Sequence, residues 1–157
     1  NFEAMRDGML QVSGELDLTM HGTSQKLEIK PYSKRRAVYG YIDRQNISST
    51  LNSFDFANPN IHAPQRVETT VPQQALFAFN HPFVIERSAT LAKRALESQN
   101  ADSASMVEFL YRKILSRDPR KGEIKLGAEF LGSDAKLANF EDLAQTLLVS
   151  NEFFFTD

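Results

Sequence analysis

The spacing of apolar residues predicts a chain of short helices, clearest in its second half. Residues 2–12 carry Phe2, Met5 and Met9 at helical spacing, and Gly14 marks the end of this first helix. Further helices are predicted at residues 42–54, from Pro72 to about 79, at 83–98, from a cap at Asp102 or Ser103 to about 114, from Pro119 to Gly132, from Asn139 to about 148, and in a final turn after Ser150 that buries Phe153 to Phe155. We therefore expect a mainly α fold, with four to five short helices in a C-terminal bundle.

The N-terminal half shows much weaker periodicity. Alternating residues favour a small β-hairpin that pairs residues 26–30 with 37–41. Residues 55–71 contain proline and asparagine breakers and form a long loop, and loops of this length are usually functional or mobile. We expect a single domain over residues 1–157, with a loop-rich part at 1–66 and a helical part at 67–157.

Composition and charge exclude several classes of function. The chain has 18 basic and 20 acidic residues, so it has no basic surface of the size that general nucleic-acid binding needs. It has no cysteine, which excludes disulfides, thiolate metal sites and a cysteine nucleophile. No apolar run reaches the ~18 residues of a membrane span. The chain starts at Asn1 without an initiator methionine, so we expect a piece of a longer protein.

A group of arginines in the loop-rich half is the main candidate site. Its members are Arg35, Arg36, Arg44 and Arg66, with the nearby carboxylates Asp43 and Asp55. The planar guanidinium suits carboxylate, sulfate or phosphate groups, so one interpretation is a site for an anion or an acidic glycan. The other is structural: the arginines bind carboxylates and carbonyls that hold a long irregular segment in place. We favour the structural interpretation.

Four other side chains extend the candidate binding group. Gln74 follows Pro72 at a helix start, where its amide can bind the 55–71 loop. His62 and Asp55 share that loop, a weak indication of a metal site. Tyr39 and Tyr41 would share one face of a strand and stack on a sugar ring or a partner.

Catalytic motifs are missing from the sequence. It contains no Gly-x-Ser-x-Gly elbow, no phosphate-binding glycine loop and no Cys-x-x-Cys-His haem attachment motif. We therefore assign no catalytic residue, and expect no metal and no cofactor in this domain.

Three segments together resemble a known family. They are Arg35-Arg36-Ala37-Val38-Tyr39-Gly40-Tyr41 followed by Arg44; Phe54-Asp55-Phe56 with Asn58-Pro59 followed by Arg66; and Thr69-Thr70-Val71-Pro72-Gln73-Gln74-Ala75-Leu76 followed by Asn80, Phe83 and Val84. Their order and spacing are similar to the C-terminal domain of a large planctomycete family of uncharacterised proteins. The resemblance runs from about Ala4 to the last residue.

The resemblance implies neighbouring domains and a cellular location, but no activity. Full-length relatives join a haem-c (cytochrome c) domain and a second uncharacterised domain to this one, and usually carry secretion signals, which implies a periplasmic or cell-surface location. Many relatives have a cysteine in the loop before the arginine that matches Arg66, where this chain has Ile61-His62-Ala63-Pro64. That difference argues against a redox role for the loop.

The last third of the chain is similar to a helical module of bacterial surface and linker proteins. The similarity lies in the segment from Leu110-Tyr111-Arg112 to Arg117-Asp118-Pro119 and in the terminal Ser150-Asn151-Glu152-Phe153. There a tyrosine and an arginine on one helix and a terminal Glu-Phe pack the module together. We expect these residues to hold helices to one another and to bind no ligand.

Two functional hypotheses follow. The first is a non-catalytic interaction or structural module of a secreted, cytochrome-c-linked protein, which docks on its sister domains or on a protein partner. The second is a binding or hydrolytic domain for an anionic, sulfated polysaccharide. It requires the arginine group to converge on one pocket.

Overall fold

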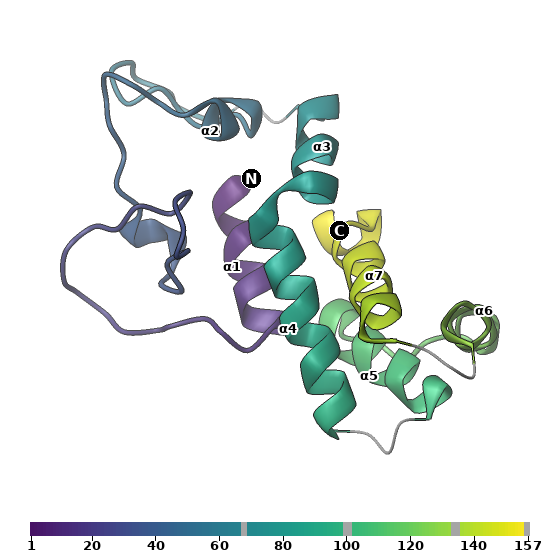
Figure 1. The fold of residues 1–157 in the computed structure, drawn as a ribbon. Helices are drawn as coiled ribbons and strands as arrows, with labels where there is room; N and C mark the ends of the chain where they lie inside the picture. The colour runs from purple at the N-terminus through teal and green to yellow at the C-terminus, as the bar shows by residue number, and fades with distance from the viewer. Residues whose placement is uncertain (67–68, 99–101, 133–135, 156–157) are drawn as a thin grey trace. The chain divides into compact units, whose positions relative to one another are not determined.

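The computed structural model describes residues 1–66, 69–98, 102–132 and 136–155, and these are mainly helical (Figure 1). Helices account for all the regular elements in these ranges, which confirms the predicted mainly α class. The chain divides into two compact units, Asn1–Ala78 and Phe79–Asp157, and each is described by itself below. No helix in the described ranges has both the length and the apolar character needed to cross a bilayer.

The first unit begins with helix α1, Phe2–Val12, as the apolar spacing predicts. The Asn1 side chain caps it by accepting a hydrogen bond from the Ala4 N–H. Its apolar face, which includes Phe2, Met9 and Leu10, is buried. The same helix also buries Arg6, whose side chain is 1% exposed. An arginine on a buried face needs hydrogen-bond acceptors. The acceptors of Arg6 lie in residues 13–48, called the irregular segment below, and are described with the candidate site.

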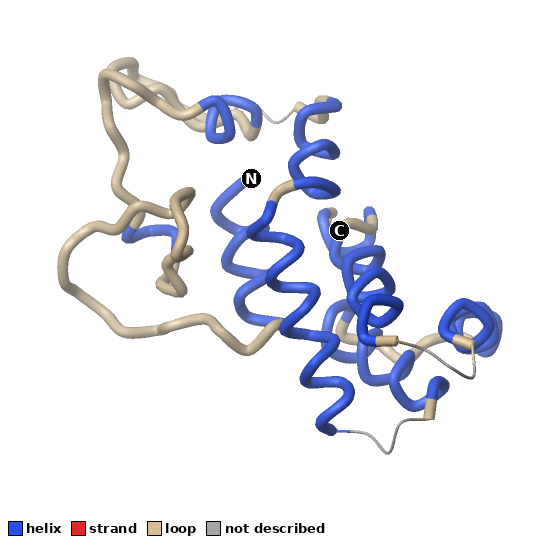
Figure 2. The backbone as a smooth tube through the Cα atoms, viewed as in Figure 1, coloured by secondary structure: helices blue, strands red, loops and turns tan. Residues whose placement is uncertain are grey.

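The predicted hairpin does not form. Residues 37–39 are a short 3₁₀ helix, η1 (Ala37–Tyr39), and the described residues between α1 and α2 contain only two isolated parallel bridges, Asp17 with Arg35 and Gln25 with Gly40. The physical reason is that the backbone donors are used elsewhere. Asp7 accepts the Ala37 N–H, and the Arg36 carbonyl accepts the Tyr39 N–H. Figure 2 shows the resulting irregular path of this segment in tan.

The predicted helix at 42–54 shortens to α2, Ser49–Ser53. Ser48 caps it by accepting from the Leu51 N–H. Upstream, Asp43 accepts a hydrogen bond from the Gln45 N–H, a local turn that competes with helix formation. The apolar residue Ile47 therefore belongs to a loop, although its spacing from Leu51 is helical.

Three phenylalanines join the helices of the first unit. Phe2 of α1, Phe54 at the end of α2 and Phe77 of α3 (Pro72–Asn80) lie with ring centroids 5.5–5.9 Å apart in tilted or edge-on pairs. Such pairs add roughly 0.5–1.5 kcal/mol each beyond the burial of their area. Through them the two ends of the irregular half pack on the first helix.

After the end of α3, the described residues of the second unit form five helices. They are α4 (Pro82–Ser98), α5 (Ser103–Leu115), α6 (Lys121–Leu131), α7 (Leu137–Leu148) and α8 (Asn151–Phe154). Helix α4 packs chiefly on α7, and α5 packs on α6. A buried cluster of Ala92, Met106, Val107, Leu131 and Phe140 fills the space between them.

Capping residues explain where these helices begin. Asp102, one of the two residues predicted as the cap, caps α5, and Ser150 caps α8 as predicted. Helix α6 begins at Lys121 and not at Pro119, because Glu123 accepts the Arg120 N–H and so fixes Arg120 as the cap. Similarly α7 begins at Leu137, since the Asn139 side chain accepts the Lys136 N–H.

The predicted burial of Phe153 to Phe155 is wrong. Phe153 and Phe154 are half-buried, and Phe155 is 56% exposed. The helix that carries them is only one turn long, so it has no continuous face to bury.

Candidate functional site

Arg35 is a buried residue of the irregular segment, and its side chain binds the main chain of another part of the same segment. Its guanidinium donates to the Thr19 carbonyl at 2.8 Å and to the His21 carbonyl, and it stacks on the Tyr39 ring with a centroid distance of 3.9 Å. The residue is 8% exposed. Arg35 therefore holds the segment in place, as the structural interpretation expects.

Arg44 and Asp43 also make local contacts. Arg44 donates to the Pro59 carbonyl at 2.6 Å, and its own carbonyl accepts from the Asn60 side chain at 3.0 Å. Asp43 is exposed and accepts the Gln45 N–H. This pair joins residues 43–45 to the start of the long loop and presents no convergent site.

Arg66 forms a bidentate ion pair with Glu3 of α1. The two terminal nitrogens donate to the two carboxylate oxygens at 3.0 and 2.8 Å, and the guanidinium lies 4.9 Å from the Phe56 ring centroid. Burial disfavours the charged carboxylate and is the largest single influence on it, but the hydrogen bonds from Arg66, a backbone hydrogen bond and the nearby positive charges together outweigh it, so the pKa of Glu3 lies below its ordinary value. The hydrogen bonds to Glu3 likewise raise the pKa of Arg66.

Asp55, Thr69 and Gln74 form a second link. Asp55 has a positive φ of 55° and accepts from the Thr69 N–H at 2.7 Å and from the Thr69 hydroxyl at 2.9 Å. The Gln74 amide donates to the carbonyls of Ser53 and Thr69 at 2.9 and 3.0 Å. Gln74 thus binds the two ends of the 55–71 loop and joins the end of α2 to the start of α3.

The remaining predicted residues are dispersed. His62 is exposed and has no hydrogen-bond partner among the described residues, while Asp55 binds Thr69, so the two form no metal site. Tyr39 is half-buried under Arg35, and its hydroxyl accepts the His21 N–H. Tyr41 is 55% exposed. The prediction that Tyr39 and Tyr41 share a strand face is wrong, because residues 37–39 are helical.

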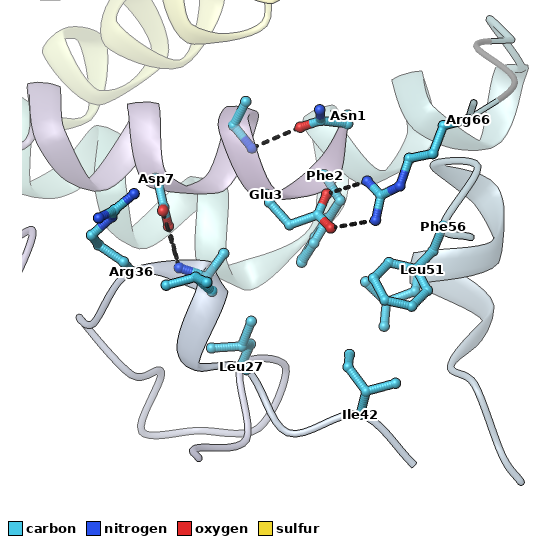
Figure 3. Close-up of a pocket in the computed structure, with 14 residues that line it drawn as sticks. Asn1, Phe2, Glu3, Asp7, Leu27, Arg36, Ile42, Leu51, Phe56 and Arg66 are labelled. Carbon is cyan, nitrogen blue, oxygen red and sulfur yellow. Dashed lines mark hydrogen bonds and ion pairs between the residues drawn. The ribbon is translucent and has the colours of Figure 1, made fainter. Parts of the chain in front are cut away.

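A cleft of about 570 Å³ lies between α1, η1 and the segment around α2 (Figure 3). This volume is within the ~300–1,000 Å³ range of small-molecule sites. Apolar side chains form one wall, and they are Leu27, Val38, Ile42, Leu51 and Phe56. The other wall is α1, with Glu3 and Asp7 one turn apart on the same helix face.

Arg36 lines this cleft at the Asp7 end, and the Glu3–Arg66 pair lies at the other end (Figure 3). The Arg36 side chain is exposed and has no hydrogen bond or ion pair in the described part of the chain. Its backbone is fixed on both sides. The Arg35 carbonyl accepts from Arg6 at 2.9 Å, and the Ala37 N–H donates to both oxygens of Asp7 at 2.8 and 3.0 Å.

Sequence reasoning missed Glu3, Arg6 and Asp7. Arg6 donates to the Ser33 and Arg35 carbonyls from a buried position, and Asp7 lies 3.2 Å from Arg6. One local signal was available. Charged residues interrupt the apolar pattern of the first helix, and a charge beside a buried stripe calls for a distant partner.

In the second unit, Arg117 joins three helices. It forms a bidentate pair with Glu123 at 2.8 Å, pairs with Glu152 of α8, and lies 5.1 Å from the Tyr111 ring centroid of α5. Hydrogen bonds from Arg117 and from the Arg120 N–H lower the pKa of Glu123 to about 2. Tyr111 and Glu152 of the predicted pattern thus connect helices through Arg117, which follows α5, whereas Arg112 of α5 pairs with Glu108 and Asp118.

Metal-ligating side chains do not gather in the described ranges: no three of His, Asp or Glu come together there. The arrangement is a mainly helical domain with an arginine-clamped irregular segment and a ligand-sized cleft. The chain matches the model of PSD1, a protein of unknown function (DUF1553), over residues 1–131, and it belongs to this family. The match ends at residue 131, short of the C-terminal extent expected from the resemblance. No curated protein and no solved structure matches the chain significantly.

Proposed function

We propose that this chain is a non-catalytic interaction module of a secreted, multidomain, cytochrome-c-linked protein at the periplasmic face or the cell surface. It docks on sister domains of the same polypeptide or on a protein partner. One observation carries the proposal: residues 15–66 bury three apolar side chains and expose six large ones. The buried ones are Ala37, Leu51 and Phe54, and the exposed ones are Leu18, Met20, Ile29, Val38, Tyr41 and Ile61.

A segment with so little core of its own needs another source of order. Here the order comes from polar clamps, above all Arg6 and Arg35 on main-chain carbonyls. The exposed apolar side chains are therefore displayed on a backbone that is already fixed. Such preorganisation reduces the entropy cost of binding, which favours a docking role over a passive loop.

The alternative proposal is a domain that binds or hydrolyses an anionic polysaccharide. It depends on several guanidinium groups that face one ligand. Arg35 and Arg44 use their donors on carbonyls, and Arg66 uses its donors on Glu3. Arg36 is the arginine of this group whose side-chain donors bind no other residue in the described part of the chain. The geometry therefore supports the interaction module better than the glycan site.

Hydroxyl-radical footprinting of the full-length protein and of the 157-residue chain tests the docking proposal. Met20 is 69% exposed and Tyr41 is 55% exposed, and both side chains react readily with hydroxyl radicals. We expect both to be oxidised in the 157-residue chain and to be protected at least severalfold in the full-length protein or its complex. Phe130 of α6, which is 52% exposed, is the internal control. Equal oxidation of Met20 and Tyr41 in both samples would contradict the proposal.

A further inference from the structure

We infer that the cleft between α1, η1 and the α2 segment binds a small apolar carboxylate, with Arg36 as the group that pairs with its charge. This inference goes beyond the docking function, since it assigns a ligand of a different class, and the two surfaces share Val38. It depends on which charged side chains of the cleft are paired, on the nature of its walls and on the fixed backbone of Arg36.

The cleft is lined by two carboxylates, Glu3 and Asp7, and two guanidiniums, and of these four groups Arg36 has no ion-pair partner within the described ranges. Glu3 is neutralised by Arg66 in a bidentate pair, and Asp7 lies beside the buried Arg6. Arg36 has no carboxylate partner in the ranges that the structure describes. A guanidinium at the edge of a cleft, with donors that bind no other described residue, can recognise a planar anion with two oxygens. The unpaired guanidinium at this end of the cleft therefore favours an anionic ligand.

The opposite wall is apolar, and four of its five side chains are half-buried or buried, while Val38 is 71% exposed. Leu27, Ile42 and Phe56 are half-buried there, and Leu51 is 6% exposed. Leu27 lies so close to Gly40 that a Cβ at Gly40 would stand 2.5 Å from the Leu27 side chain. A wall of this kind stabilises a hydrocarbon chain or ring and offers no partner to a polyhydroxylated sugar. The ligand is therefore apolar except for its acidic group.

The geometry separates these two features. Arg36 lies at the Asp7 end of the cleft, and Leu51 and Phe56 lie toward the Glu3–Arg66 end (Figure 3). A ligand that satisfies both carries its carboxylate at one end and its apolar part at the other. The clamps on either side of Arg36, through the Arg35 carbonyl and the Ala37 N–H, hold that end in place before the ligand arrives.

A titration of the ¹⁵N-labelled chain with decanoate, followed by NMR, tests the inference. We expect saturable shifts at cleft amides, among them Ala37 and Gly40, and about tenfold weaker binding of decanol, which lacks the charge. Because a charge-assisted hydrogen bond contributes roughly 1.5–3 kcal/mol, Arg36→Gln should weaken decanoate binding about ten- to hundredfold. The same variant should leave decanol binding unchanged.

Lys26→Gln is the matched control. Lys26 is an exposed cation of the same segment that does not line the cleft, so its loss changes the net charge equally. Ile42→Gln is a second variant, and it should weaken decanoate and decanol alike. The inference is overturned by shifts that do not saturate, by shifts outside the cleft, or by equal affinities in Arg36→Gln and Lys26→Gln. Failure here leaves the footprinting result unaffected, so the two proposals are tested separately.

Discussion

Arg66 and Glu3 are 63 residues apart and form a bidentate ion pair. The pair joins the end of the irregular half to the first turn of α1. Both side chains are about 30% exposed, at 31% and 29%, so water screens their attraction in part. The contact is therefore a geometric constraint on the cleft as much as a source of stability.

We predict a coupling energy of about 1 kcal/mol for this pair, at the upper end for partly exposed ion pairs. The measurement is a double-mutant cycle with Glu3→Gln and Arg66→Gln, from urea unfolding. Lys125 and Glu129 of α6 are 3.9 Å apart and largely exposed, and their cycle should give a coupling near zero. Equal couplings in the two cycles would mean that the bidentate geometry adds nothing.

Asp55 has two roles that substitutions can separate. Asp55→Ala removes the acceptor for Thr69 and places alanine at a φ of 55°, so we expect a loss of about 2 kcal/mol in unfolding free energy. Asp55→Gly also removes the acceptor, but glycine adopts a positive φ without strain. This variant should therefore be about 1 kcal/mol more stable than Asp55→Ala. Asp55→Asn should be the mildest. Chemical denaturation of the three variants gives the order, and a glycine variant no better than alanine would argue against backbone strain.

The Arg117 cluster should make stability depend on pH in the acid range. The folded pKa of Glu123 is about 2, lowered first by Arg117, whereas an unfolded glutamate titrates near ~4.3. A lowered folded pKa means that the stabilisation is complete above the unfolded value and is lost as pH falls from about 4.3 towards 2. The pKa of Glu152 is lowered by the same arginine and acts in the same direction.

The test of this pH dependence is Glu123→Gln. It should be less stable than the wild type at neutral pH, and the difference should shrink as the pH approaches 2. Urea midpoints measured between pH 2 and 6 give both curves. Glu97→Gln, at an exposed position of α4, should run parallel to the wild type. Parallel curves for Glu123→Gln as well would rule out the ion pair as the origin of the effect.

Two glycines of α6 should respond oppositely to alanine. A Cβ at Gly127 would lie 2.7 Å from a methyl group of the buried, β-branched Val107, so Gly127→Ala forces α5 and α6 apart and should destabilise by about 1–3 kcal/mol. A Cβ at Gly122 would meet nothing within 4 Å, so Gly122→Ala should stabilise by up to about 1 kcal/mol. Thermal unfolding measures both. Adding Val107→Ala should recover part of the Gly127→Ala loss.

Local signals in the sequence predicted most of the helices. The apolar spacing of residues 2–12 and the capping side chains Asp102 and Ser150 act over a few residues, so they can be read without knowing the fold. The hairpin and the long helix at 42–54 failed for a physical reason. In both segments a side chain accepts a backbone N–H that the predicted element would use. In the hairpin region this side chain is Asp7, which lies 30 residues from Ala37, whose N–H it accepts.

The candidate site likewise combines features that local sequence signals predict with contacts between distant residues that they do not. The arginines of the irregular half were identified from the sequence, and their type suggested either an anion site or internal clamps. Which of the four remains available depends on partners such as Glu3 and the Thr19 carbonyl, which no spacing rule relates to Arg66 or Arg35. Arg36 differs from its neighbour Arg35 only in the direction that the folded backbone gives it.

Arg6, Arg35 and Arg44 all donate to main-chain carbonyls. A carbonyl is present whatever side chain a residue carries, so the acceptor positions Ser33, Thr19 and Pro59 can change without loss of the acceptor. The shape of the segment is thus encoded by a few donors, while exposed positions such as Leu18 and Ile29 are free to vary. Related chains can therefore evolve different binding preferences while the arginine contacts keep the same backbone conformation.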